Sequence, residues 1–193
     1  ITFNTPNAVT YASGSTVDIS NFASASSGLS IIYTVVSGPG TLGANNILSI
    51  NGAGSIVITA SQPGDASHNP ASSVTQTLVV DKANPTITFA NISKTYGDLP
   101  FTPSYSSNSN GNISWSSSAT SVASTSGNYV SVVGAGTATI TLQQAESDNY
   151  LSASVTATLT VSKATQTITH SAIADLYAAD FYYNPIALTA TTS

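Results

Sequence analysis

The sequence predicts an all-β fold made of tandem β-sandwiches arranged end to end. Three observations support this prediction: a long internal repeat, apolar and polar residues that alternate, and an unusual composition. Only 6% of the 193 residues are charged, whereas 41% are hydrophobic, and Cys and Met are absent. Ser, Thr, Ala, Val and Ile dominate, so the chain is rich in strand formers and poor in helix formers. Its apolar content is that of a folded protein rather than a disordered one.

The internal repeat has a period of about eighty residues. Thr-Ile-Thr-Phe at residues 86–89 recurs as Thr-Ile-Thr-His at residues 167–170, and Gly-Ala-Gly at residues 52–54 recurs at residues 134–136. A unit of this length can bury a core of its own, which the roughly 20 to 50 residues of a solenoid repeat cannot do. The repeats are therefore expected to be separate domains in a row.

Three units follow from this period. Residues 1–81 are predicted to form the first domain, residues 82–163 the second, and residues 164–193 the incomplete start of a third. The third segment offers only two strands, around Ile168, Tyr177, Phe181 and Leu188. Two strands cannot bury an apolar face in water, so either the natural chain continues beyond this stretch or the tail pairs with the edge of another sheet. The repeat favours the first of these.

The strands of the two complete repeats are predicted from alternation with a period of two. In the first repeat Ile56, Ile58 and Ala60 face inward, followed by a last strand with Leu78 inward. The second repeat places Ile140 and Leu159 inward in the same way, with threonines such as Thr139 and Thr158 outward, and each repeat has one large aromatic on a central strand, Tyr33 or Trp115. Six or seven short strands with Gly- and Pro-rich turns between them are typical of a β-sandwich.

Several motifs make a resemblance specific. Lys-Thr-Tyr-Gly-Asp at residues 94–98, the run that ends in Gly-Ala-Gly-Thr-Ala-Thr-Ile-Thr at residues 134–141, and Asp-Asn-Tyr at residues 148–150 resemble bacterial immunoglobulin-like repeats. This resemblance implies immunoglobulin-like sandwiches of a large secreted adhesin on a bacterial cell surface, including some gliding adhesins. The first repeat departs from the pattern, with Tyr-Ala-Ser-Gly at residues 11–14 and His-Asn-Pro at residues 68–70.

Composition excludes several classes of partner. With only Lys82, Lys94 and Lys163 as cationic side chains and a net charge of −5, the chain cannot neutralise a phosphate backbone, so nucleic acid is not expected to bind. No apolar run approaches the roughly 18 residues that a membrane-spanning helix needs, so this segment is not expected to insert into a membrane. The expected partners are neighbouring repeats of the same longer chain, and a surface glycan or protein.

Catalysis is not expected. Of the two histidines, His68 lies in a predicted loop with Asp65 and Ser67, and His170 takes the strand position of Phe89. One short loop cannot form the sharp strand-to-helix turn that presents a nucleophilic serine, and no Gly-x-Ser-x-Gly motif is present. The chain is therefore interpreted as non-enzymatic.

A calcium site is the metal hypothesis that the sequence allows. In a sandwich of this topology, the loop between the last two strands lies beside the linker from the preceding domain. Asp81 in the first linker would then approach Glu146 and Asp148, and three carboxylates form the oxygen-rich shell that Ca²⁺ prefers. The alternative is that these are solvated loop acids, and Ser162 replaces the aspartate at the second linker. No other cofactor is expected.

Two functions remain open. The first is a structural spacer or stalk, whose role is reach. The second is an immunoglobulin-like module that binds a carbohydrate or a protein through its loops. The spacer is favoured because most Tyr and Trp positions alternate into the core, which leaves few aromatics to stack on sugars. Phe181, Tyr182 and Tyr183 are the exception, because adjacent aromatics on a strand cannot all face inward.

Overall fold

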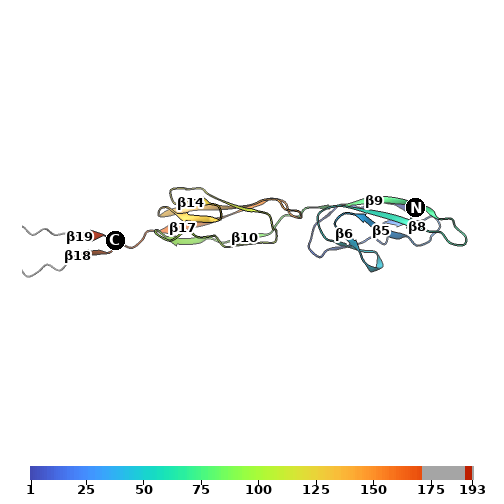
Figure 1. The fold of residues 1–193 in the computed structure, drawn as a ribbon, viewed down its shortest axis with the longest axis horizontal. Coiled ribbons are helices and arrows are strands. Elements are labelled where there is room, and N and C mark those ends of the chain that lie inside the picture. Colours follow the sequence, from blue (N-terminus) through green and yellow to red (C-terminus); the bar gives the residue numbers. More distant parts are fainter. Residues whose placement is uncertain (171–189, 193) are drawn as a thin grey trace, which may run out of the picture.

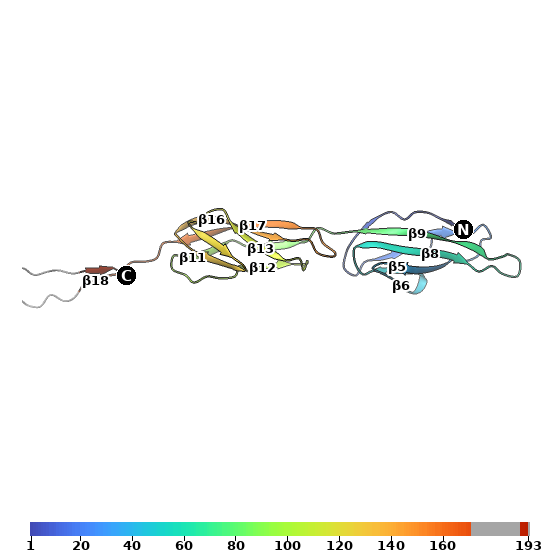
Figure 2. The ribbon, with the colours of Figure 1, turned by 45° about the horizontal axis from the view of Figure 1, so that its top comes forward.

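The computed structural model describes residues 1–170 and 190–192. The fold is all-β: within these residues the only helical segment is the 3-10 turn η1 (Ala44–Asn46). No helix in the described part of the chain has the length and apolar character that crossing a membrane requires. Two β-sandwiches follow one another along the long axis of the molecule, as predicted (Figure 1, Figure 2).

The first sandwich is built from nine strands, most of which belong to two main sheets. One sheet has the order β2-β9-β8-β5, the other has the order β3-β7-β6, and β1 pairs with β4. The strands are β1 (Thr2–Phe3), β2 (Val9–Thr10), β3 (Thr16–Asp18), β4 (Ala23–Ser24), β5 (Ile32–Ser37), β6 (Gly40–Leu42), β7 (Ile47–Ile50), β8 (Gly54–Gln62) and β9 (Ala71–Asp81).

The second sandwich repeats this plan. Its four-stranded sheet has the order β11-β17-β16-β13, and β10-β12 and β14-β15 form two further pairs. The strands are β10 (Ile87–Phe89), β11 (Ile92–Thr95), β12 (Tyr105–Ser107), β13 (Ile113–Ser117), β14 (Ala123–Ser126), β15 (Tyr129–Val132), β16 (Gly136–Gln144) and β17 (Ala153–Ser162). Beyond it, β18 (Ile168–His170) pairs with β19 (Ala190–Thr192) in antiparallel fashion.

Each of the two sandwiches has an unusual strand pairing at one edge of its four-stranded sheet. β2 runs parallel to β9, and β11 runs parallel to β17, whereas the other strand pairs of both sandwiches are antiparallel. In each sandwich the leading segment first pairs outside the four-stranded sheet, as β1 with β4 or β10 with β12. It then crosses to the four-stranded sheet and pairs with the last strand, as β2 with β9 or β11 with β17. The leading segment of each repeat is therefore divided into two short strands, because the chain changes sheets partway along.

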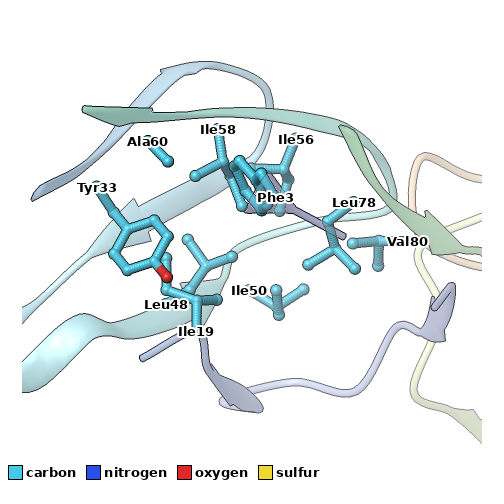
Figure 3. Packing of buried hydrophobic residues seen from close by; sticks show 10 residues of the cluster. All are labelled: Phe3, Ile19, Tyr33, Leu48, Ile50, Ile56, Ile58, Ala60, Leu78 and Val80. Atoms are coloured by element: carbon cyan, nitrogen blue, oxygen red, sulfur yellow. The ribbon is translucent and has the colours of Figure 1, made fainter. Parts of the chain in front are cut away.

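Each sandwich has its own core, and the predicted register is correct. Ile58, Leu78, Ile140 and Leu159 are fully buried, and Tyr33 and Trp115 are also in the core. Thr139 and Thr158 lie opposite each other on the exposed face. Figure 3 shows the cluster of the first sandwich, which consists of Phe3, Ile19, Tyr33, Leu48, Ile50, Ile56, Ile58, Ala60, Leu78 and Val80.

The two core aromatics are held differently. The Tyr33 ring meets the Phe3 ring edge to face at 6.0 Å, and its hydroxyl accepts a hydrogen bond from the N–H of Ala23 at 2.8 Å. The Trp115 ring lies 5.2 Å from Phe89 and 5.8 Å from Tyr105. Aromatic contacts of this kind contribute about 0.5–1.5 kcal/mol beyond the area they bury.

The buried residues fall into two clusters, one in each sandwich. β9 ends at Asp81 and β17 ends at Ser162. Domain boundaries at residues 81 and 163, with a third domain beginning at residue 164, stay predictions that agree with these strand ends.

Candidate functional site

The joint between the two sandwiches is where side chains from distant parts of the sequence converge. Ala83, the second residue after the end of β9, donates its N–H to the carbonyl oxygen of Asn149 at 3.0 Å, and its own carbonyl accepts the N–H of Leu151 at 2.8 Å. Ala83 and Tyr150 thus form a parallel bridge. The sequence analysis expects the β16–β17 loop beside this linker, and these contacts confirm that placement.

The same loop also contacts the first sandwich. The side-chain oxygen of Asn149 accepts a hydrogen bond from the N–H of Ala53 at 2.9 Å. A Cβ atom added to Gly52 would lie 3.0 Å from that oxygen, so glycine provides the room that Asn149 occupies. The Tyr150 ring meets the Tyr11 ring edge to face at 5.6 Å, and Tyr11 is itself tied by its N–H to the carbonyl of Asp81 at 2.8 Å.

An ion pair crosses the outside of the joint. Lys82 Nζ lies 2.6 Å from Glu146 Oε1 and also donates to the carbonyl oxygen of Ser147 at 2.8 Å. The side chains of Lys82 and Glu146 are 31% and 60% exposed, so water and salt screen their attraction. Such a pair contributes at most about 1 kcal/mol. Its larger effect is to hold the linker against the loop.

The three predicted calcium ligands are not assembled into a metal-binding group. Glu146 pairs with Lys82, while Asp81 and Asp148 are exposed. Across the described residues, no three His, Cys, Asp or Glu side chains come close enough together to hold a metal ion. The topology therefore brings the predicted loop to the linker, but it places a lysine against the glutamate. Calcium binding by Asp81, Glu146 and Asp148 stays a prediction.

The corresponding loop of the first sandwich lies at its other end, between β8 and β9. Asp65 accepts hydrogen bonds from the N–H of Ser67 at 2.8 Å and from His68 Nδ1 at 3.0 Å. The pKa of the Asp65 carboxyl lies below its usual value, first because of the hydrogen bond from the N–H of Ser67 and second because of the one from the His68 ring. Both side chains are about half exposed, and the pair stabilises its own turn rather than a cleft.

Two sequence candidates cannot be placed. Phe181, Tyr182 and Tyr183 lie outside the described residues, and so does the side chain of His170. Sequence reasoning also missed the roles of Tyr11 and Ala53 at the joint. Their signal was present, because Tyr11 and the Gly-Ala-Gly turn both recur in the second repeat, but a recurring motif does not reveal its partner across a joint.

Comparison with known protein families finds no match, and comparison with curated proteins finds no relative. Among solved structures, Drosophila N-cadherin EC1-3 is similar with a TM-score of 0.34 and 12% sequence identity, over 69% of this chain and 55% of that one. Drosophila N-cadherin EC1-4 gives a TM-score of 0.32 at 12% identity, over 68% of this chain and 41% of that one. The chain thus spans about half the length of these cadherin structures or less.

Proposed function

We propose that this chain is a structural spacer: a non-catalytic stalk segment of a large extracellular adhesin on a bacterial cell surface. The observation that carries the proposal is the first joint. Its linker is hydrogen bonded to the Asn149 and Leu151 backbone, and the same loop reaches back to Tyr11 and Ala53. A joint fixed on two sides keeps consecutive domains in line, which a flexible linker does not.

The geometry of the strands supports this role. Both sandwiches have their long strands, β8 and β9 or β16 and β17, roughly along the molecular axis, and the chain enters and leaves each sandwich at opposite ends (Figure 2). Strands of about ten residues rise ~3.4 Å per residue, so each domain adds on the order of 35 Å to the reach of the stalk. Such a segment transmits position and force between its two ends.

The outer surface also suits a spacer. On the β16–β17 ribbon the outward positions pair threonine with threonine, as in Thr139 opposite Thr158 and Thr141 opposite Thr156. Threonine favours strands and hydrates well without charge. These paired threonines present hydroxyl and methyl groups, and neither a charge nor an aromatic ring that would select a partner.

The test is to measure shape and binding on the same protein. Small-angle X-ray scattering of the 193-residue chain should give an elongated particle, and glycan arrays and cell-adhesion assays should show no saturable binding. Two results would overturn the proposal: a compact particle with the sandwiches folded on each other, or specific binding that Asp148→Ala abolishes without a change in melting temperature. The second result would favour the binding module.

A further inference from the structure

The far end of the second sandwich repeats the surface that the first sandwich uses at the joint. The N–H of Tyr96 donates to the carbonyl of Ser162 at 2.8 Å, as the N–H of Tyr11 does to Asp81. The two Gly-Ala-Gly turns also match, because Gly54 and Gly136 take the same positive φ, 133° and 144°. Tyr96, Gly134, Ala135 and Lys163, here called the distal surface, therefore correspond to Tyr11, Gly52, Ala53 and Lys82.

The two surfaces differ in what covers them. At the joint Gly52 is buried, and Tyr11, Ala53 and Lys82 are half-buried. On the distal surface Tyr96 is 53% exposed, and Ala135 and Lys163 are exposed.

Within the described residues, the Ala135 amide and the Tyr96 ring lack the contacts that their counterparts make at the joint. Whereas the N–H of Ala53 donates to Asn149, the N–H of Ala135 has no acceptor within the described part of the chain. Tyr96 likewise makes no ring contact there, whereas Tyr11 contacts Tyr150. An open hollow runs between Tyr96, Gly97, Ala135 and the linker at Lys163 and Ala164. Its lining offers one N–H donor, one aromatic ring and one ammonium group.

We propose that the distal surface is a docking site for the end loop of a following sandwich domain of the same kind. The contacts at the first joint indicate which chemical groups that loop must present. An asparagine side-chain oxygen accepts from the N–H of Ala135, an aromatic residue directly after it packs edge to face on Tyr96, and a carboxylate three residues before the asparagine pairs with Lys163. Glu146, Asn149 and Tyr150 present this order at the first joint. The inference rests on the proposed function, because the same contact, repeated at each joint, would let further domains extend the spacer.

The test keeps every residue of the chain and adds the proposed occupant. A second copy of residues 83–163 is inserted between Lys163 and Ala164, so that its own Glu-x-x-Asn-Tyr loop is brought to the distal surface. Hydrogen exchange by NMR then follows the Ala135 amide of the original repeat. Exchange should slow by roughly tenfold on insertion, the protection expected of one hydrogen bond, and approach that of Ala53 in the same molecule. The Tyr96 ring resonances should shift as well.

The matched control carries Asn149→Ala and Tyr150→Ala in the inserted copy alone, and Ala135 should then exchange as fast as in the original chain. A second experiment does not depend on the folding of the insert. A ring-closed peptide of residues 144–153 is titrated into the labelled 193-residue chain, where it should shift Ala135 and Tyr96 but leave Ala53, whose site is filled, unchanged.

An unchanged Ala135 amide in both experiments overturns the docking site. Scattering of the inserted chain separates this failure from that of the spacer. A longer particle with an unprotected Ala135 removes the docking site and keeps the spacer. A protected Ala135 in a chain that binds a glycan specifically removes the spacer and keeps the docking site.

Discussion

Asn149 and Ala53 are 96 residues apart in the sequence, yet the side-chain oxygen of Asn149 lies 2.9 Å from the backbone nitrogen of Ala53. This hydrogen bond joins the first sandwich to a loop of the second without any contribution from the linker. Together with the bonds between Ala83 and that loop, it defines a joint that has two independent attachments. If the two sandwiches were connected only through the chain at Lys82, the joint would have a single attachment.

Asn149→Ala should loosen the joint without unfolding either sandwich. The substitution leaves the N–H of Ala53 to water and removes about 1 kcal/mol of contact free energy. Residual dipolar couplings should show a wider distribution of angles between the two sandwiches, while the two melting temperatures stay unchanged. Asn69→Ala is the matched control, because Asn69 is an exposed residue in the corresponding loop of the first sandwich. A fall in melting temperature with Asn149→Ala alone would instead mean that the loop stabilises the core of its own domain.

The contact between Tyr11 and Tyr150 should depend on the rings and not on the hydroxyls. The rings meet edge to face at 5.6 Å, a geometry worth about 0.5–1.5 kcal/mol. Tyr150→Phe should therefore preserve the angle between the sandwiches, whereas Tyr150→Ala should broaden it, as measured by the same couplings. Equal broadening by both variants would assign the effect to the phenol oxygen.

Trp115→Ala should unfold the second sandwich far more readily than the first. Removing this ring from the core deletes its contacts with Phe89 and Tyr105 and leaves a cavity, at a cost of about 3–5 kcal/mol. That is comparable to much of the stability of a small domain. Calorimetry should show one transition that moves and one that does not, because the joint is small. Tyr33→Ala should move the other transition, and a single shared transition in either variant would contradict independent folding.

The parts of this fold that the sequence predicts are those that depend on local periodicity. In β16, Ile140 and Leu142 face inward and Thr139 faces outward because side chains in a strand alternate between faces, and a slip of one residue would expose the whole apolar set. The position of the β16–β17 loop beside the linker also follows, because sandwich topology determines which loops share an end. These inferences need no knowledge of distant contacts.

The parts that sequence reasoning misses depend on distant contacts. Gln144 is 1% exposed at the end of β16, although glutamine is usually a surface residue. Its burial is possible because Ser107, Ser109 and Gly111, more than thirty residues away, supply its hydrogen bonds. The calcium hypothesis has the same weakness. Counting carboxylates at the joint does not reveal that Lys82 reaches Glu146.

Gln144→Leu should destabilise the second sandwich by about 1–3 kcal/mol. The amide nitrogen of Gln144 donates to the carbonyl oxygens of Ser109 at 2.9 Å and Gly111 at 3.2 Å, and leucine would leave both without this donor. Gln62→Leu is the comparison in the first sandwich, where the Gln62 side chain accepts the N–H of Gly64 at 3.0 Å and makes no other hydrogen bond within the described residues. Urea unfolding should show the larger loss for Gln144→Leu, and equal losses would mean that the extra hydrogen bonds contribute nothing.

The calcium prediction can now be stated as a competition at the joint. Ca²⁺ held by Asp81, Glu146 and Asp148 must displace Lys82 from Glu146, where the ammonium lies 2.6 Å from the carboxylate. We therefore expect weak binding, with a dissociation constant on the order of 10⁻³ M as in extracellular modules. Lys82→Met removes the competing cation and should tighten binding at least severalfold in calorimetric titration, with a narrower range of interdomain angles in scattering with calcium than with chelator. If neither chain binds calcium and the profiles coincide, Asp81 and Asp148 are solvated loop residues, and the joint is held by Asn149, Tyr150, the linker backbone and the pair between Lys82 and Glu146.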